Sequence, residues 1–291
     1  IVIFPALQFN KTQTSAGDRS WLRLAPYPKR NHTVTVMHLK HNPRRGNAIT
    51  CRRSKTSFDL VLIGGGLQSA LIVMAVLHHR PQTKIALLEK EKTLGGNHTW
   101  SFMEHAIPKA ASAWIEPLIS HRWPSYEVRF VDFQRRFDEP YRSILSDTLH
   151  RAVKQRLSDT PGCRLFLSTP VEKTFAGTAF LTDGRRIQGR QIISSCGPRT
   201  PHSHHCGFQK FVGLELSLAA PHDLDTPVLM DATIAQTDGF RFFYILPFTS
   251  HRVLIEDTYF SRNAILDKDT IRREILAEAA RRGWSVTEVL R

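Results

Sequence analysis

Two short apolar runs, separated by a glycine-rich turn and an amphipathic stretch, form the clearest pattern in the chain. Residues 58–63 and 84–88 have the unbroken apolar character of strands buried in a parallel sheet. Residues 67–79 between them place apolar side chains along one face at helical spacing, and Pro81 ends this stretch. A strand–helix–strand unit of about thirty residues predicts a parallel α/β arrangement.

The remainder of the chain mixes helix and strand patterns. Residues 146–157 and 264–283 have helical periodicity, and Asp183–Gly184 predicts the turn of a hairpin over 179–188. No closing element is predicted before Arg291. Further strands are expected at residues 191–193, 210–218, 227–231, 240–246 and 252–257.

Composition favours a globular protein kept in a reducing compartment. Of 291 residues, 41% are hydrophobic and 23% are charged, which argues against disorder throughout. The sequence contains no apolar run of 18 residues, so no transmembrane helix is predicted. The four cysteines form no CxxC pair, which argues against a disulfide framework. They are Cys51, Cys163, Cys196 and Cys206.

The net charge of +14 is concentrated near the start of the chain. Residues 1–57 hold eleven basic residues and a single acid, Asp18, which leaves a net of only +4 for the remainder. We therefore expect a basic leader at 1–57, disordered or non-native, followed by a nearly balanced body without a nucleic-acid partner. An acid-poor basic leader is also typical of an organellar transit peptide, and this alternative stays open.

The turn between the first strand and helix has the spacing of a dinucleotide-binding loop. Gly64 permits the tight turn, Gly66 lets the backbone approach a pyrophosphate, and Ser69 takes the position that requires a small side chain. Glu89 follows the second strand, where a carboxylate accepts hydrogen bonds from a ribose hydroxyl. The alternative is a glycine turn that packs without a ligand, and this motif alone does not separate NAD from FAD.

A second glycine pair favours FAD. Gly95 and Gly96 come shortly after the acid and resemble the loop of FAD-binding proteins of the glutathione-reductase type. We therefore predict an α/β fold with a Rossmann-like FAD-binding domain of that type and an interleaved mixed β-sheet substrate domain. Within 58–291, the expected division is a dinucleotide-binding βαβ unit at 58–110 and a substrate-side portion at about 111–145 and 207–291.

Three segments resemble bacterial-type lycopene beta-cyclases, in the order in which that family carries them. They are GGNHTWSF at 95–102, PVLMDAT at 227–233 leading into GFRFFYILP at 239–247, and LIEDT at 254–258. The resemblance covers roughly residues 58–291. It implies a membrane-associated flavoprotein, peripheral to the membrane in the bacterial cytoplasm, that closes the linear ends of lycopene and related carotenoids into beta-ionone rings. The products would be gamma-carotene and beta-carotene.

The family reaction is an isomerisation without net redox change. The resemblance nonetheless implies that FAD is required in its reduced form, with NAD(P)H as the electron source. Ring closure protonates an alkene and passes through a tertiary carbocation, so the protein must supply an acid, a base and a water-excluded pocket. Burial beside a like charge raises the pKa of a carboxyl group and lets it hold a proton at neutral pH.

Glu256 and Asp257 are the candidate catalytic pair. Adjacent strand residues point to opposite faces, so a single member of the pair is expected to face a pocket. From spacing alone, both acids could instead cap a strand end and meet Arg241 or Arg252. The family resemblance implies that Glu256 is the acid/base residue and that Asp257 supports the backbone.

Other candidate residues give weaker signals. Phe242 and Tyr244 would share one face of a strand, while Phe243 would lie on the other, so the aromatic cluster at 240–244 cannot line one pocket as a whole. The stretch His202–Cys206 lacks a second ligand cluster, and no metal site is predicted. His98 is expected to be structural or adjacent to the flavin.

Two departures from the family pattern are evident. Ser194–Gly197 stands where the family usually carries a segment with an acid and an arginine, and a C-terminal portion of roughly a hundred residues is missing. We therefore expect a truncated chain that binds FAD poorly and has little cyclase activity. A related FAD-dependent oxidoreductase or hydroxylase acting on an apolar substrate, and an inactive remnant, are the alternatives.

Overall fold

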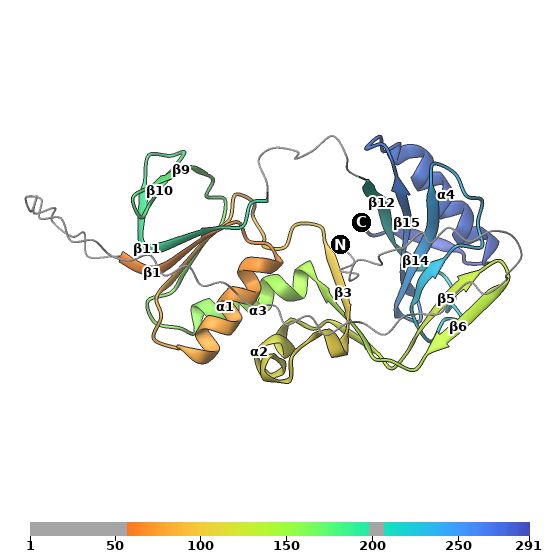
Figure 1. Ribbon diagram of the computed structural model, residues 1–291, viewed down its shortest axis with the longest axis horizontal. Helices are drawn as coiled ribbons and strands as arrows, with labels where there is room; N and C mark the ends of the chain where they lie inside the picture. The colour runs from red at the N-terminus through yellow and green to blue at the C-terminus, as the bar shows by residue number, and fades with distance from the viewer. Residues whose placement is uncertain (1–56, 198–206) are drawn as a thin grey trace, which may run out of the picture. The chain divides into compact units, whose positions relative to one another are not determined.

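The computed structural model describes residues 57–197 and 207–291 (Figure 1). The strand–helix–strand unit lies in a six-stranded sheet with the order β8-β2-β1-β11-β10-β9. Strands β8, β2, β1 and β11 run parallel, and β11, β10 and β9 pair antiparallel at the other edge. The strands are β1 (Ser57–Ile63), β2 (Ile85–Leu88), β8 (Arg164–Phe166), β9 (Val171–Phe175), β10 (Thr178–Leu181) and β11 (Arg186–Ser194).

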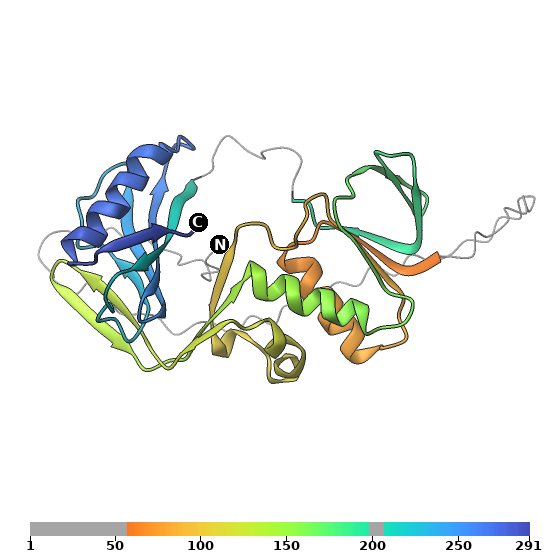
Figure 2. The same cartoon turned by 180° about the vertical axis from the view of Figure 1, so that it is seen from behind.

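Two helices, α1 (Leu67–His79) and α3 (Ser146–Ser158), lie side by side against this sheet (Figures 1 and 2). Their apolar stripes meet the β1 and β2 side chains in one core, to which Val73, Leu77 and Leu149 contribute. Burial of these stripes removes apolar surface from water and stabilises the unit.

The second sheet has seven strands in the order β16-β12-β15-β14-β13-β5-β6. Helix α4 (Lys268–Arg281) covers one of its faces through Ile271, Ile275 and Ala279 (Figure 2). The strands are β5 (Tyr126–Phe130), β6 (Phe133–Phe137), β12 (Phe208–Leu218), β13 (Val228–Asp231), β14 (Phe240–Thr249), β15 (Arg252–Ser261) and β16 (Val286–Val289).

A three-stranded antiparallel sheet with the order β3-β7-β4 packs on the other face of the seven-stranded sheet. Trp123 and Tyr141 from this small sheet share a core with Phe242 and Tyr244 of β14. Its strands are β3 (Thr99–Met103), β4 (His121–Trp123) and β7 (Tyr141–Leu145), and between β3 and β4 lie the short helices η1 (Glu104–Ala106), η2 (Lys109–Ala111), α2 (Ser112–Ile115) and η3 (Glu116–Leu118).

Most elements predicted from the sequence are confirmed. Helix 67–79 is found with the predicted bounds, and the predicted helix 146–157 extends by one residue. The hairpin at Asp183–Gly184 and the four later strands are also present. Two expectations are wrong: β15 continues to Ser261 rather than ending near 257, and β16 closes the chain by pairing with β12.

Some predictions concern residues outside the described ranges. The basic leader at 1–57, apart from Ser57, and the stretch His202–Cys206 are among these, so both stay predictions. Within 57–197 and 207–291, no helix is long and apolar enough to cross a membrane. The same residues contain no group of three His, Cys, Asp or Glu side chains that could hold a metal ion.

Candidate functional site

The glycine loop between β1 and α1 forms a cradle that is open on one side. Gly64 has a φ of +94°, which a side chain would strain, and it makes the tight turn out of β1. Gly66 is the N-cap of α1, and a Cβ built there would meet nothing within 4 Å. Ser69 is fully buried one turn later, and its hydroxyl has no hydrogen-bond partner among the described residues.

The middle glycine, which the motif treats as a free position, is required for packing. A Cβ on Gly65 would lie 2.4 Å from Leu94 Cδ2 and 3.0 Å from the Glu89 carboxylate. The Gly65 amide donates to Glu89 Oε2 at 2.5 Å, and the Glu91 amide donates to Glu89 Oε1 at 2.9 Å. These bonds hold the carboxylate at the end of β2, directly beside the loop.

The second glycine pair closes against the first. Gly95 and Gly96 both have positive φ values, and the Gly95 amide donates to the Gly65 carbonyl at 2.9 Å. A Cβ on Gly95 would lie 3.0 Å from the side chain of Ser146, where α3 begins. His150 of α3, which the sequence did not indicate, accepts the Leu94 amide through Nδ1 at 3.1 Å.

The six predicted cofactor residues thus surround one place, where β1, β2 and the second glycine loop meet. Helix α1 has no side-chain cap and no acid in its first turn, so its free N–H groups and positive dipole end are left for an anion. The open side at Gly66 gives room for a pyrophosphate, and Glu89 stands where a ribose hydroxyl would lie. These residues fit an adenine dinucleotide.

Ser194–Gly197, where the family pattern is broken, lies against the same loop. A Cβ on Gly64 would meet the Ser195 carbonyl at 3.1 Å, and the Cys196 thiol donates to the Ile63 carbonyl at 3.6 Å. This segment therefore contributes backbone contacts to the loop. The His98 ring is tilted by 41° against Trp100, with ring centroids 5.5 Å apart, and burial lowers the pKa of His98.

The candidate catalytic pair lies in the middle of β15, between β12 and β14, and caps no strand end. Spacing alone also allowed both acids to cap a strand end, and their position within β15 contradicts that alternative. As alternation predicts, the two side chains point to opposite faces of the sheet. Asp257 lies on the α4 face with Ile255 and Tyr259, and Glu256 lies on the opposite face with Leu254.

Asp257 is fully buried and fully paired. Arg241 donates to it through Nε at 2.9 Å and Nη2 at 2.7 Å, and the Tyr259 hydroxyl donates at 3.0 Å. Arg241 also bonds Glu274 of α4 at 3.2 Å. The Asp257 carboxylate is thus engaged by a bidentate guanidinium and a phenol, which link β15 to β14.

Glu256 has the opposite surroundings. Its side chain is nearly buried, with Gly213 of β12 on one flank and Tyr244 of β14 on the other. The Thr258 hydroxyl donates to Oε1 at 2.9 Å, and no lysine or arginine of the described ranges forms an ion pair with it. Burial raises the pKa of Glu256 against the opposing effect of the Thr258 bond, so the environment favours the protonated acid.

Two phenols lie beside this acid. The hydroxyls of Tyr244 and Tyr141 are 3.0 Å apart, and burial raises the pKa of both groups. Tyr244 and Phe242 share the Glu256 face, whereas Phe243 packs on the α4 face, as predicted. The Glu256 side of the sheet is therefore apolar and aromatic around one uncompensated carboxyl group.

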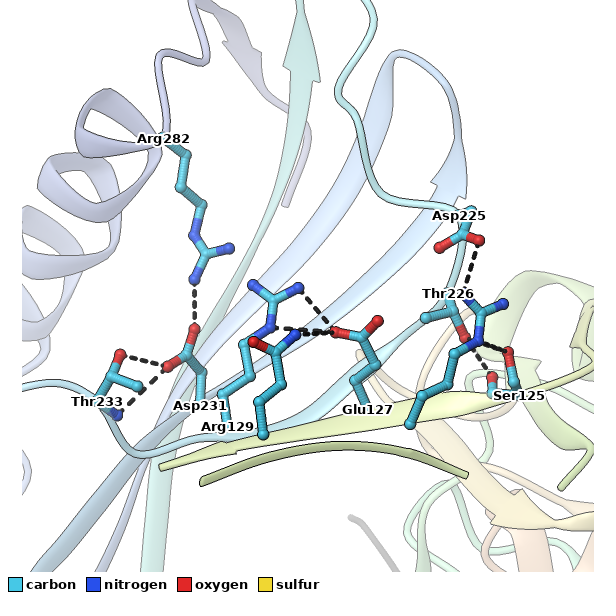
Figure 3. Close-up of polar contacts among 10 residues, drawn as sticks. Ser125, Glu127, Arg129, Asp225, Thr226, Asp231, Thr233 and Arg282 are labelled. Atoms are coloured by element: carbon cyan, nitrogen blue, oxygen red, sulfur yellow. Dashed lines mark hydrogen bonds and ion pairs between the residues drawn. The ribbon is translucent and has the colours of Figure 1, made fainter. Parts of the chain in front are cut away.

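The α4 face carries further ion pairs, which Figure 3 shows on one side of β5 and β13. Arg282, just after α4, donates to Asp231 at 2.6 Å, and Thr233 donates to the same carboxylate at 2.6 Å. Glu127 accepts from Arg129 at 2.9 Å. These acids are compensated, which leaves Glu256 as the candidate proton donor in this sheet.

The fold is shared with solved flavoprotein structures. PqsL of Pseudomonas aeruginosa, described as a probable FAD-dependent monooxygenase, matches 78% of this chain and 66% of its own, with a TM-score of 0.56 and 15% identity. The p-nitrophenol 4-monooxygenase PnpA of Pseudomonas putida matches 81% of this chain and 65% of its own, with a TM-score of 0.57 and 12% identity. The α/β fold of FAD-dependent monooxygenases is thereby established for this chain.

Sequence relatives are closer. A lycopene beta-cyclase of Pantoea ananas is 36% identical over 234 residues, and one of Pseudescherichia vulneris is 35% identical over 233 residues. Each alignment covers 80% of this chain, which spans 60% and 59%, respectively, of the length of those relatives. The family model for lycopene cyclase proteins matches residues 59–291. The chain therefore belongs to the lycopene cyclase family.

Proposed function

We propose that the chain carries the acid/base half of an FAD-dependent lycopene beta-cyclase, which converts the linear ends of lycopene into beta-ionone rings. The observation that carries this proposal is the environment of Glu256: a buried carboxyl group with a raised pKa, on an aromatic face, without a cation partner in the described residues. A protonated acid in such a place can transfer its proton to an unactivated alkene, because water does not compete for it.

One residue is enough to balance the protons of the reaction. Glu256 donates a proton to the terminal double bond, and a tertiary carbocation forms. The neighbouring double bond attacks the cation and closes the ring, and a proton then leaves the ring carbon to regenerate an alkene. The Glu256 carboxylate can take back this proton, so the enzyme returns to its starting state without a net change in protons or electrons.

The faces of Tyr244 and Phe242 support the same step. Both rings are buried on the Glu256 side of β14, and aromatic faces present negative potential to a cation. Asp257 acts through the opposite face, where its bonds to Arg241 and Tyr259 fix β15 and thereby the position of Glu256. We assign Glu256 the catalytic role and Asp257 a positioning role.

FAD is the proposed cofactor, in the mode of the glutathione-reductase type. Gly64, Gly66 and the start of α1 with Ser69 would hold its pyrophosphate, and Glu89 would hold its ribose, with Gly95 and Gly96 closing the loop. When bound in its reduced form, with NAD(P)H as the electron source, the flavin supplies negative charge that stabilises the cationic intermediate. We further propose that the protein acts at the cytoplasmic surface of a membrane, since its substrate is a long hydrocarbon.

The glycine loop can be tested by FAD titration. Gly66→Ala places a methyl group on the open side of the cradle, where no protein atom lies within 4 Å, so folding should be retained while FAD affinity falls. Gly207→Ala is the matched control, because its φ is also outside the left-handed region and the nearest atom to a Cβ built there is the Ser261 carbonyl oxygen at 3.9 Å, just before β12. Equal FAD affinity of the two variants would contradict the assignment.

Catalysis is tested by pigment analysis in lycopene-accumulating cells. Because little activity is expected of this chain, we expect small but detectable amounts of cyclised products from the wild-type chain, none from Glu256→Gln, and wild-type amounts from Glu288→Gln, a change of an exposed carboxylate on β16. Purified protein should convert lycopene without net consumption of NAD(P)H, whereas a hydroxylase would consume it in proportion to product. Equal cyclised product from wild type and Glu256→Gln would remove Glu256 from the mechanism.

A further inference from the structure

A histidine of α3 holds the start of the second glycine loop. His150, in the second turn of this helix, accepts the backbone amide of Leu94 through Nδ1 at 3.1 Å. A backbone N–H can only donate, so Nδ1 carries no proton and the ring is the neutral tautomer with its hydrogen on Nε2. The bond between His150 and Leu94 therefore exists only while the ring is uncharged.

Leu94 connects this bond to the cofactor cradle. Its side chain is 1% exposed, and a Cβ on Gly65 would lie 2.4 Å from Leu94 Cδ2. The next residue, Gly95, donates its amide to the Gly65 carbonyl at 2.9 Å. The Gly65 amide in turn donates to Glu89, the proposed ribose ligand. Because Leu94 contacts Gly65 by its side chain and through the adjoining peptide, a displacement of Leu94 would disturb both glycine loops.

The surroundings of His150 favour the uncharged ring. Burial has the largest effect and lowers the pKa of His150 from its ordinary value of 6.5. Lys154, one turn later on α3, lowers this pKa further, whereas Asp147, one turn earlier, raises it.

Other charged or titratable groups lie on the elements packed against α3 and in the segment before Leu94. They are His78 and His79 on α1, Glu116 on η3, Arg142 on β7, Arg164 on β8 and residues 89–92. None of them forms an ion pair with His150 in the described part of the chain, where Glu116 pairs with Arg122 and Arg142 with Glu104. The charge state of His150 therefore depends on its own burial and on its two neighbours along α3.

We propose that His150 is a positioning residue for FAD: its neutral ring keeps the second glycine loop against the first, and its protonation weakens binding of the cofactor. In the protonated ring, Nδ1–H would face the Leu94 N–H, so two donors would meet and the amide would lose its acceptor. FAD would then have to order the loop as it binds, which lowers its affinity. This inference rests on the proposed function and adds a residue and a pH dependence to the cofactor site.

The direction of the pH dependence follows from the bond. Because burial keeps the pKa of His150 below 6.5, the ring is neutral and the Leu94 bond is intact at neutral pH. As the pH falls below 6.5, the ring takes up a proton, and FAD affinity should decrease by about fivefold, the effect of one lost hydrogen bond. By the same linkage, bound FAD opposes protonation of the ring and should lower the pKa of His150.

The test measures FAD affinity against pH for the 291-residue chain and its variants. Quenching of flavin fluorescence is followed between about pH 7.5 and about pH 5, the range in which histidine titrates. His150→Asn keeps an acceptor oxygen at the position of Nδ1 but does not titrate, so it should bind FAD as the wild type does at the upper pH and lose no affinity at the lower. His150→Leu has no acceptor and should bind about fivefold more weakly at the upper pH.

His98 is the matched control, because it is the other histidine beside the glycine loops. A Cβ on Gly96 would lie 3.6 Å from the His98 ring, and burial lowers the pKa of His98 as well. His98→Asn should keep the pH dependence of the wild type. If His98→Asn abolished that dependence while His150→Asn retained it, the effect would belong to His98 and the proposal would be overturned. Thermal unfolding of each variant confirms that the fold is retained.

The outcomes separate the role of His150 from the proposed cofactor. If FAD binds with the same affinity at both ends of the pH range, or if wild type and His150→Asn show the same pH dependence, His150 has no such role and the FAD proposal stands. A pKa of His150 that FAD leaves unchanged, measured by NMR of the ring C–H protons in the wild-type chain, would have the same meaning. No FAD binding at any pH would overturn the cofactor proposal and the role of His150 together.

Discussion

Asp257 and Glu256, which are adjacent on β15, lie on opposite faces of the seven-stranded sheet and have opposite surroundings. On the α4 face, Asp257 is held by Arg241 and Tyr259, and Asp231 is held by Arg282 and Thr233 (Figure 3). On the other face, Glu256 receives one hydroxyl hydrogen bond from Thr258 and no ion pair from the described residues. The peptide backbone places Glu256 and Asp257 next to each other, so the difference comes from the side chains that each face gathers.

The two acids therefore differ in what their surroundings favour: one is suited to stabilise the fold and the other to hold a proton. A buried carboxylate with a bidentate arginine forms strong, directed hydrogen bonds that link neighbouring elements. A buried carboxyl group without a cation is costly when ionised, and it therefore holds its proton more strongly. One strand thus carries both a fully paired acid and the acid that we propose as the proton donor.

The largest expected effect is the loss of the fully paired acid. Asp257→Ala leaves the Arg241 guanidinium, which is 5% exposed, without its main partner, and we expect a loss of about 3–5 kcal/mol in the free energy of unfolding. Glu256→Ala on the opposite face removes a carboxyl group with no cation partner and should cost clearly less. Urea unfolding of both variants measures the contrast, and equal losses would break the comparison between the faces.

A smaller effect is expected at the second ion pair of the α4 face. Arg282→Met leaves Asp231, which is 3% exposed, with Thr233 as its remaining side-chain partner, and it also removes the 2.6 Å bond from Arg282 Nε to the buried Glu278, so we expect a loss of about 1–3 kcal/mol. Arg273→Met is the matched control, since Arg273 is exposed on α4 and bonds only Thr270 of its own helix. Equal free energies of unfolding for the two variants in chemical unfolding would show that Arg282 does not stabilise the buried Asp231.

Alternation along β15 was enough to predict that Glu256 and Asp257 face opposite sides. It was not enough to choose between Arg241 and Arg252 as the partner of Asp257, because that choice depends on strand register. Arg241 lies opposite Tyr259 on the Asp257 face, whereas Arg252 lies near the other end of β15 and pairs with Glu215 of β12. Register is set by contacts between strands that are far apart in the sequence.

Other features were missed for two distinct reasons. The extension of β15 to Ser261 had a local signal, since Thr258, Tyr259 and Phe260 are β-branched or aromatic. Strand β16 had none: residues 286–289 are short and half-exposed, and they become a strand by pairing with β12, about seventy residues earlier. The demand for glycine at 65 likewise comes from Leu94, which the βαβ motif does not include.

The raised pKa of Glu256 predicts a pH-dependent cost. Because the folded state binds this proton more tightly than the unfolded state, the contribution of Glu256 to stability falls as pH rises from its ordinary value of 4.5 through the raised pKa. Glu256→Gln removes the ionisation, so its melting temperature should exceed that of wild type by an amount that grows as the pH rises above 4.5. The other groups titrate in both proteins and cancel in the difference. A constant difference across this range would mean that Glu256 is not destabilised as an anion.

The smallest expected effect concerns the phenols beside Glu256. Tyr141→Phe removes the hydroxyl that lies 3.0 Å from that of Tyr244, and it leaves the Tyr244 hydroxyl buried without that partner, at a cost of about 1 kcal/mol. Removal of both hydroxyls in Tyr141→Phe, Tyr244→Phe removes the pair as a whole, so the double variant should lose less than the sum of the two single losses. The cycle of single and double variants, followed by urea unfolding, isolates the pair. If the free energy lost in the double variant equals the sum of the two single losses, each hydroxyl has a partner of its own. The Glu256 face would then be more polar than its contrast with the α4 face implies.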